Sequence, residues 1–291
     1  MLSVSRPFVL FRFIRWVDVM ILEGVPILGV AFSAGSQVVA EPMRFLVFAL
    51  AVFLLLAHVF TLNDWADFTR GVHHSSHAML QLERRNATPR QLLIFSFLLL
   101  AASAGILLFL SERSLLLGLA VAALGIFYSH PSLNAKSMPI VSTLVHLAGG
   151  TLHFLVGYGL MLPIDSRGVL IGLFFGLTFA AGHPLQEVRD VSIDREVGAR
   201  TNAVVFGKLG SFVASLILFT VQYAYLFWLA WSGLLTRWIA ILPLVAWPIH
   251  FWLAMEPFRR GLTPESVGYF EKRYRVLYAI IGLAMLVSAV R

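Results

Sequence analysis

Cysteine is absent from the 291-residue chain, and charged side chains are scarce. Without cysteine there is neither a disulfide framework nor a thiolate metal site, so any metal ligand must be a carboxylate, amide or imidazole group. Charged residues make up only 13% of the chain and hydrophobic residues 59%, whereas soluble domains contain about 25% charged residues. These proportions exclude an ordinary water-soluble fold and indicate an integral membrane protein.

No second domain stands out along the sequence, and we expect residues 1–291 to form one membrane-embedded domain. The net charge of +7 would suggest nucleic acid in another protein. Here no basic hydrophilic segment offers a binding domain, so nucleic acid is excluded and positive loops beside anionic lipid account for the charge. The first residues lack the short apolar region and cleavage site of a signal peptide, so we expect the amino terminus to be retained.

Apolar runs bounded by charge, Gly or Pro predict nine transmembrane helices, because about 20 apolar residues cross a bilayer as a helix. They lie near residues 13–33, 43–62, 91–110, 114–128, 138–161, 167–183, 210–231, 236–256 and 275–290. The sequence therefore predicts an all-α, polytopic membrane protein.

Basic residues are divided unevenly between the two sides that nine helices would create. Of the 22 Lys and Arg residues, one side receives only Arg44, Arg113, Arg167, Arg237 and Arg291. Loops rich in Lys and Arg stay in the cytoplasm. We therefore expect a multi-pass protein of the cell inner membrane with a cytoplasmic amino terminus and long cytoplasmic loops.

Two polar segments, which follow the second and sixth predicted helices, share a spacing of acids. The first reads Asn63-Asp64-Trp65-Ala66-Asp67-Phe68-Thr69-Arg70-Gly71, and the second reads Gln186-Glu187-Val188-Arg189-Asp190-Val191-Ser192-Ile193-Asp194-Arg195. In both, an amide precedes an acid and a second acid follows three residues later, which makes a weak internal repeat. Continued as helix, positions i, i+3 and i+7 lie within about 60° of one another, so each segment presents one carboxylate face.

Carboxylates held this close repel one another, and hard divalent cations relieve the repulsion. Mg²⁺ is usually held by one or two carboxylates together with waters and phosphate oxygens. Two carboxylate faces are therefore suited to binding a diphosphate between them. Basic residues that would clamp a leaving diphosphate lie nearby at Arg70, Lys136, Arg189, Arg195 and Arg200.

In these segments the chain resembles the UbiA superfamily of intramembrane prenyltransferases. Three motifs carry the resemblance: Asn63-Asp64-x-x-Asp67, Tyr128-Ser129-x-Pro131-x-x-x-x-Lys136, and Asp190-x-x-x-Asp194 with its continuation Arg195-Glu196-Val197-Gly198-Ala199-Arg200-Thr201. The resemblance implies nine helices around a central lipid-open cavity with a cytoplasmic cap. It also implies Mg²⁺-dependent transfer of an isoprenyl chain from a prenyl diphosphate to an aromatic acceptor of the quinone-precursor or secondary-metabolite kind.

The resemblance also implies roles for individual residues. The expected metal-binding set is Asn63, Asp64, Asp67, Glu187, Asp190 and Asp194, and the expected diphosphate-binding set is Lys136, Arg70, Arg195 and Arg200. Asp64, Asp67, Asp190 and Asp194 are the expected catalytic acids. We choose Tyr128 as the ring that stabilises the allylic cation through a cation-π contact, because its motif places it beside Lys136.

The first motif departs from the family pattern in two places. Many aromatic prenyltransferases of the superfamily have a third Asp where this chain has Gly71, and members acting on naphthoate have an Asp where it has His73. The first carboxylate face therefore has fewer metal ligands than the second, or it uses an imidazole group as a ligand. His73 and His77, four residues apart, also leave open a transition-metal site.

Two other functions remain open at this point. A relative that cyclises a polyprenyl chain would generate the same cation without an aromatic acceptor, and a transporter would use the acidic faces as a gate. Glu23 lies within the first predicted helix, where an acid is costly in the bilayer. It either lines the acceptor pocket or has a helix-capping or water-facing role beside Gly24 and Pro26.

Overall fold

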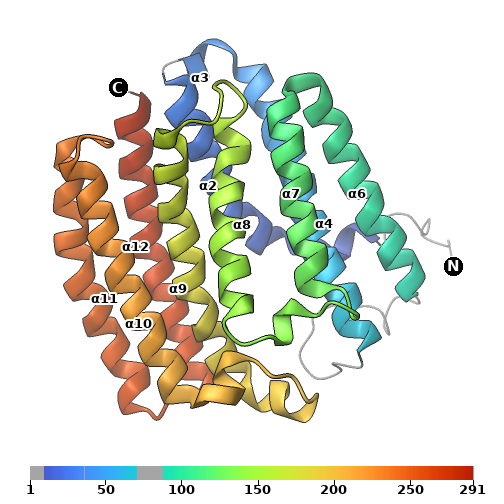
Figure 1. The fold of residues 1–291 in the computed structure, drawn as a ribbon, viewed down its shortest axis with the longest axis vertical. Coiled ribbons are helices and arrows are strands. Elements are labelled where there is room, and N and C mark those ends of the chain that lie inside the picture. The colour runs from blue at the N-terminus through green and yellow to red at the C-terminus, as the bar shows by residue number, and fades with distance from the viewer. Residues whose placement is uncertain (1–9, 36, 71–87, 291) are drawn as a thin grey trace, which may run out of the picture.

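The computed structural model describes residues 10–35, 37–70 and 88–290, and all regular structure in these ranges is helical. Nine long helices run side by side along the length of the molecule (Figure 1). They are α2 (Trp16–Ala34), α4 (Pro42–Thr69), α6 (Pro89–Leu110), α7 (Glu112–Ser129), α8 (Val141–Tyr158), α9 (Ser166–Glu196), α10 (Asn202–Trp231), α11 (Ile241–Arg259) and α12 (Pro264–Val290). A short helix, α3 (Gln37–Ala40), and three 3₁₀ helices (Phe11–Phe13, Ala135–Ser137 and Arg237–Ala240) complete the described structure. The predicted all-α fold with nine long helices is confirmed.

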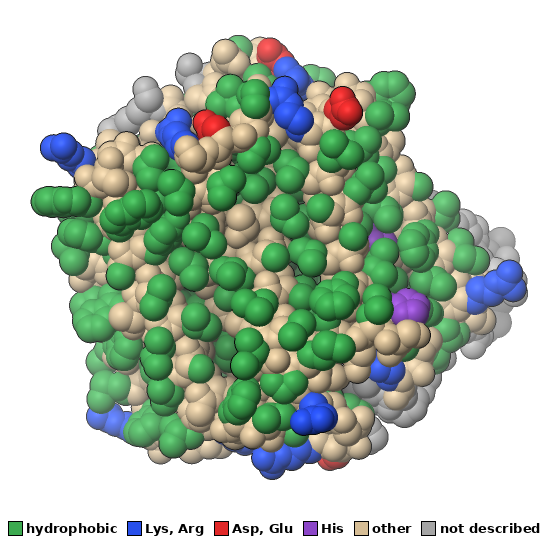
Figure 2. All heavy atoms as spheres, viewed as in Figure 1, with side chains coloured by type: hydrophobic (Ala, Val, Ile, Leu, Met, Phe, Trp, Pro, Cys, Tyr) green, Lys and Arg blue, Asp and Glu red, His purple; other side chains and the backbone are tan. Residues whose placement is uncertain are grey.

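The surface has the character expected of a protein in a bilayer. Eight of the nine long helices in the described ranges are long and apolar enough to cross a membrane, and α8, which carries His146 and His153, is the ninth. On the face shown in Figure 2, hydrophobic side chains cover the middle, and most charged ones lie toward the two ends. A bilayer replaces water around that middle band, so exposed apolar side chains are stabilising there.

Local sequence explains where several helices begin. Thr88 accepts a hydrogen bond from the backbone N–H of Gln91, and the Gln91 side chain accepts one from the backbone N–H of Thr88, so that α6 starts with a capping box. Pro89 occupies the first helical position, where its missing N–H is harmless. Asp165 caps α9 by accepting from the backbone N–H of Gly168 at 2.7 Å.

Glycines allow α8 to lie very close to α2. A Cβ added to Gly157 would lie 1.9 Å from the carbonyl oxygen of Pro26, and one added to Gly29 would lie 2.1 Å from that of Phe154. Small residues at a helix interface let membrane helices approach until their backbones touch. This packing holds α8 against α2, and α8 also packs against α7 and α9.

The helices at one end of the bundle extend well past the predicted spans. Helix α4 continues to Thr69 and α9 to Glu196, while α10 begins at Asn202 with a break at Gly207, whose φ is +81°. The acids of both segments therefore lie on the last turns of α4 and α9, which continue as helix beyond the predicted spans. These turns stay helical because they pack against neighbouring helices and satisfy their own backbone groups. In Figure 1 these ends lie in the lower part of the molecule, as do the starts of α8 and α10.

Candidate active site

The first acidic motif lies on the last two turns of α4, and its two acids are buried. Asp64 is 1% exposed and Asp67 is 7% exposed. Burying a carboxylate is costly unless a partner of opposite charge or a metal accompanies it. In this structure each acid has a basic partner, and the two partners are different.

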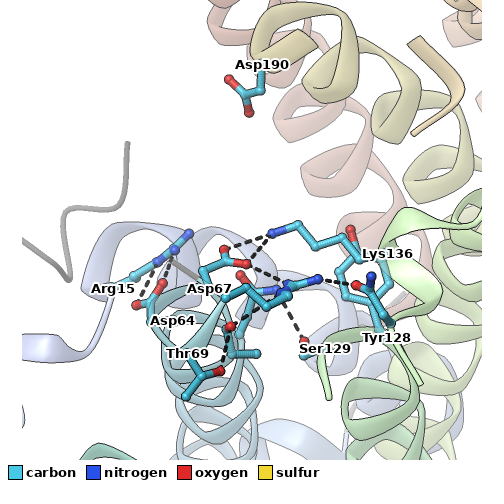
Figure 3. Close-up of polar contacts among 12 residues, drawn as sticks. Arg15, Asp64, Asp67, Thr69, Tyr128, Ser129, Lys136 and Asp190 are labelled. Carbon is cyan, nitrogen blue, oxygen red and sulfur yellow. Dashed lines mark hydrogen bonds and ion pairs between the residues drawn. The ribbon is translucent and has the colours of Figure 1, made fainter. Parts of the chain in front are cut away.

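Asp64 forms a two-pronged ion pair with Arg15, the residue before the first turn of α2. Arg15 Nε donates to Asp64 Oδ2 at 3.2 Å, and Arg15 Nη2 donates to Asp64 Oδ1. Figure 3 shows this pair on the side of α4 that faces the amino-terminal segment. A planar guanidinium matches a carboxylate in this way, which ties the start of α2 to the end of α4.

Asp67 binds two basic side chains that belong to different elements. Lys136 Nζ donates to Asp67 Oδ1 at 2.9 Å and to Oδ2 at 2.8 Å, and Arg70 Nη2 donates to Oδ1 at 2.8 Å. Arg70 Nη1 also donates to the side-chain oxygen of Asn134, in the connection between α7 and α8. The first and middle motifs therefore meet through Asp67 and Lys136 (Figure 3).

Asn63, the amide of the first motif, is hydrogen-bonded within the bundle. Its Nδ2 donates to Ser129 Oγ at 3.2 Å, which joins the end of α4 to the end of α7. This bond leaves the Asn63 carbonyl oxygen as the atom that a metal ion would use.

The two acids of the second motif have different surroundings on α9. Asp190 is held by its neighbour Arg189, whose Nε donates to Oδ1 at 2.9 Å and whose Nη2 donates to Oδ2 at 2.8 Å. Asp194 Oδ2 accepts a hydrogen bond from Thr201 Oγ1 at 3.0 Å. Asp190 lies apart from the Asp67 cluster in Figure 3.

One cavity of about 330 Å³ brings parts of both acidic motifs together. Asp67 from the first motif and Asp194 from the second contribute to its wall. Arg70, Lys136 and Arg200 line the same cavity. Two carboxylates and three cations thus face one space between the ends of α4 and α9. Carboxylates can bind a divalent cation, and guanidinium and ammonium groups can bind phosphate oxygens.

Glu187 lies deeper in the bundle than the acids of the cavity, on α9 facing α8. It is 6% exposed, and its Oε1 accepts from Ser142 Oγ at 3.2 Å and from Asn202 Nδ2 at 3.1 Å. Its Oε2 is buried and has no hydrogen-bond partner among the described residues. An unpaired carboxylate oxygen in such a place is a free ligand position.

Tyr128 belongs to a polar aromatic cluster between α7, α8 and α9. Its hydroxyl lies 3.3 Å from Nε2 of His183, and its ring makes an edge contact with the ring of His146. The His146 and His183 rings lie 3.9 Å apart, and His183 Nδ1 is 3.6 Å from Glu187 Oε1. The hydroxyl is thereby fixed, and the tyrosine ring has a defined orientation.

Several sequence predictions receive no direct support from this geometry. Arg195 is exposed and is not among the described residues that line the cavity. Gly71, His73 and His77 lie outside the described residues, and so does any transition-metal site that they would form. Within the described ranges, no group of three or more His, Asp or Glu residues is arranged to hold a metal ion by itself. Mg²⁺ at this site would therefore complete its coordination with waters or diphosphate oxygens.

Sequence reasoning missed the partners that hold the acids. Arg15 binds Asp64 across 49 residues of sequence, and Glu271 binds Arg189 across 82 residues. His183, two helical turns before Asp190, contacts Tyr128. Its i, i+4 spacing from Glu187 was the one available signal, because residues four apart share a helix face.

These features define a class, a multi-pass helical membrane protein with acidic motifs gathered at one end of the bundle. The sequence matches the UbiA prenyltransferase family over residues 24–264. The chain belongs to this family and is a multi-pass integral membrane prenyltransferase.

Solved structures agree with the fold. A structure from work on digeranylgeranylglyceryl phosphate synthase in membranes is similar with a TM-score of 0.75 at 17% identity, over 99% of both chains. A UbiA homolog from Archaeoglobus fulgidus bound to DMAPP and Mg²⁺ has a TM-score of 0.69 at 18% identity, over 96% of this chain and 99% of that chain. The apo structure of a UbiA homolog from Aeropyrum pernix K1 has a TM-score of 0.70 at 18% identity, over 93% of this chain and 98% of that chain. No protein with a curated description matches the sequence.

Proposed function

We propose that the enzyme binds an isoprenyl diphosphate with Mg²⁺ in the cavity between the ends of α4 and α9. The observation that carries this proposal is that Asp67, Asp194, Lys136, Arg70 and Arg200 line the same cavity. The donor set fits the metal, because carboxylate oxygens are the ligands that Mg²⁺ prefers. The structure of the Archaeoglobus fulgidus homolog with DMAPP and Mg²⁺ supports the proposal.

Each residue of the predicted site has a place in this proposal. Asp67 and Asp194 would hold the metal, and Asp64, Asp190, Asn63 and Glu187 would be further oxygen ligands once Asp64 and Asp190 are released from their arginines. Lys136, Arg70 and Arg200 bind the diphosphate oxygens, and Arg195 approaches from the exposed end of α9. When bound, Mg²⁺ would neutralise charge that develops on the departing diphosphate.

The chain's own residues then control what happens to the prenyl group. Lys136 and Arg70 leave Asp67 and turn their donors to the diphosphate, which stabilises it as a leaving group. Tyr128, held by His183, presents its ring to the allylic cation. The helical wall excludes water, which would otherwise capture the cation.

We propose an aromatic, quinone-precursor-like acceptor, whose ring carbon attacks the allylic carbon and loses a proton. The first motif supports this choice, since it most resembles the naphthoate-type pattern. A prenylated glyceryl phosphate is the second candidate, because the structure with a TM-score of 0.75 comes from work on digeranylgeranylglyceryl phosphate synthase.

The acceptor and the reaction are tested together. Membranes that contain the protein are incubated with labelled geranyl, farnesyl or geranylgeranyl diphosphate, Mg²⁺, and either hydroxybenzoate, dihydroxynaphthoate, geranylgeranylglyceryl phosphate or no acceptor. A prenylated aromatic product supports the proposal. Transfer of a second, labelled prenyl chain to geranylgeranylglyceryl phosphate selects the second candidate. Hydrocarbon formed without an acceptor identifies a cyclase, and release of neither product nor diphosphate contradicts the assignment of the cavity.

We also propose that the acidic end of the bundle faces the cytoplasm of the cell that makes the protein, in its inner membrane. The excess of Lys and Arg on that side supports this orientation. Because the chain has no cysteine, single cysteines report sidedness directly. Ser132 at the acidic end and Ser232 at the opposite end are both exposed. In intact spheroplasts, an impermeant maleimide should label Ser232→Cys and spare Ser132→Cys, and the reverse pattern would contradict the orientation.

A further inference from the structure

Arg189 connects the second acidic motif to the last helix of the bundle. Its Nε and Nη2 atoms bind the two carboxylate oxygens of Asp190, and its Nη1 donates to Glu271 Oε2 on α12. Helices α9 and α12 lie side by side, and the Arg189 stem passes Gly268, one turn before Glu271. One guanidinium is thus shared between an acid of the motif and an acid outside it.

The two acids that share Arg189 have different surroundings. The Asp190 side chain is 42% exposed and that of Glu271 only 4% exposed. Glu271 Oε1 is buried and has no hydrogen-bond partner among the described residues. Glu271 therefore holds Arg189 with one oxygen and has a second acceptor position still open, which is a costly arrangement for a buried carboxylate.

We propose that Glu271 is a positioning residue that takes Arg189 away from Asp190 when Asp190 turns to the metal and diphosphate. Arg189 donates to both oxygens of Asp190 in this structure, so the guanidinium competes with a metal ion for this acid. Rotation toward α12 gives Arg189 a second bond, to Glu271 Oε1, in exchange for those it loses. The inference rests on the proposed role of Asp190 as a metal ligand.

The exchange depends on Glu271 carrying a charge. Two-pronged guanidinium–carboxylate pairs are among the strongest polar contacts in proteins. With Glu271 replaced by Gln, Asp190 would be the remaining charged partner of Arg189, and the guanidinium would compete with the metal more strongly. Removing Arg189 as well would end the competition. The effect of Glu271→Gln on metal binding should therefore disappear in a variant that lacks Arg189.

The test measures Mn²⁺ binding to the purified full-length protein in detergent, without substrate, from the electron paramagnetic resonance signal of free Mn²⁺. The variants are Glu271→Gln, Arg189→Met and the double variant Glu271→Gln/Arg189→Met. Glu271→Gln should weaken binding about tenfold, the factor expected when one charge-assisted hydrogen bond changes its balance. The double variant should bind Mn²⁺ at least as tightly as the original protein, because no guanidinium then competes for Asp190. The Mg²⁺ dependence of turnover should shift in parallel for Glu271→Gln.

A matched control and a second substitution keep the result interpretable. Glu256 on α11 also pairs with two arginines, Arg260 at 3.3 Å and Arg273 at 3.5 Å, but it does not bind Arg189. Glu256→Gln should therefore leave Mn²⁺ binding unchanged. Glu271→Asp keeps the charge with a shorter reach and should lie between the original protein and Glu271→Gln, which gives a reading if Glu271→Gln does not fold.

The outcomes separate the inference from the proposed function. Unchanged binding in Glu271→Gln, or a double variant as weak as Glu271→Gln, would overturn the role of Glu271 and leave the metal site intact. Full binding by Asp190→Asn would instead remove Asp190 from the metal site, and with it the proposed function of this acid. Rescue by loss of Arg189 is a result that a purely structural role of Glu271 does not produce.

Discussion

Lys136 Nζ lies 2.8 and 2.9 Å from the two carboxylate oxygens of Asp67, so one ammonium group occupies the position where a cation would bind this acid. The pair joins the connection after α7 to the last turn of α4 and lines the cavity. A metal-bound diphosphate would replace an internal ion pair here. In our proposal the same lysine would then bind the diphosphate, which carries more negative charge than one carboxylate.

We therefore predict that Lys136→Met lowers kcat/KM for the prenyl diphosphate by about 100-fold, the loss typical of one electrostatic donor to a developing anion. Mn²⁺ binding without substrate should become tighter, because Asp67 loses a competing cation. Steady-state kinetics and spin-resonance titration measure the two effects. Lys208, which donates to the backbone oxygen of Leu262, provides the control substitution Lys208→Met, with both values unchanged. Weaker Mn²⁺ binding in Lys136→Met would contradict the arrangement.

A second prediction concerns the acids that bind arginine. Asp64→Asn and Asp190→Asn should each abolish prenyl transfer in Mg²⁺ buffer while the protein still inserts in the membrane and purifies as a single species. Product formation with labelled diphosphate and size-exclusion profiles measure the two properties. Asp18, in the first turn of α2, offers Asp18→Asn as a control that keeps activity. Full turnover by both acid variants would remove them from the metal site.

The positions of the helices were predictable because hydropathy alone specifies them. Runs of apolar residues near 43–62 and 91–110 became α4 and α6, since a bilayer-spanning segment must be apolar throughout and must satisfy its own backbone bonds. The same criterion failed at the ends. The last turns of α4 and α9 are polar and yet helical. Asp64 and Asp67 are buried at the end of α4, whereas the last turn of α9 exposes Arg195 and Glu196.

The candidate site was only partly visible in the sequence. Local spacing placed Asp64 with Asp67 and Asp190 with Asp194, because neighbouring helical turns share a face. The spacing of the acids does not indicate which distant residue contacts each of them. The partners Arg15 and Glu271 come from the first and last helices of the bundle, so tertiary packing decides those contacts.

The surroundings of Glu23 also could not be predicted from the sequence. Its position within an apolar run predicted either a pocket residue or a water-facing one. The structure buries it to 6% exposure, with both carboxylate oxygens unpaired among the described residues. A water-facing role is therefore inconsistent with the structure, and the place of Glu23 in the acceptor pocket stays a prediction.

Tyr128 offers a prediction that separates its ring from its hydroxyl. Tyr128→Phe removes the bond to His183 but keeps the ring, so kcat should fall by less than about fivefold. Tyr128→Leu removes the ring, and kcat should fall by about 30-fold, which corresponds to about 2 kcal/mol of cation-π stabilisation in a desolvated site. Single-turnover assays at saturating diphosphate measure both rates. Equal losses in the two variants would assign the role to the hydroxyl instead.

The contact between Gly157 and Pro26 makes the last prediction, which concerns stability. A Cβ at residue 157 would lie 1.9 Å from the Pro26 carbonyl oxygen, and this oxygen belongs to backbone that cannot rotate away. Helices α2 and α8 must then separate, which would cost about 1–3 kcal/mol as overpacking and would displace Arg15 at the start of α2. Gly149→Ala, on the same helix with no atom within 4 Å of the new Cβ, is the matched control. In detergent, Gly157→Ala should unfold at a clearly lower temperature than Gly149→Ala, because α2 and α8 can no longer pack backbone against backbone. Equal unfolding temperatures for the two variants would show that the helices are not held at the separation described here.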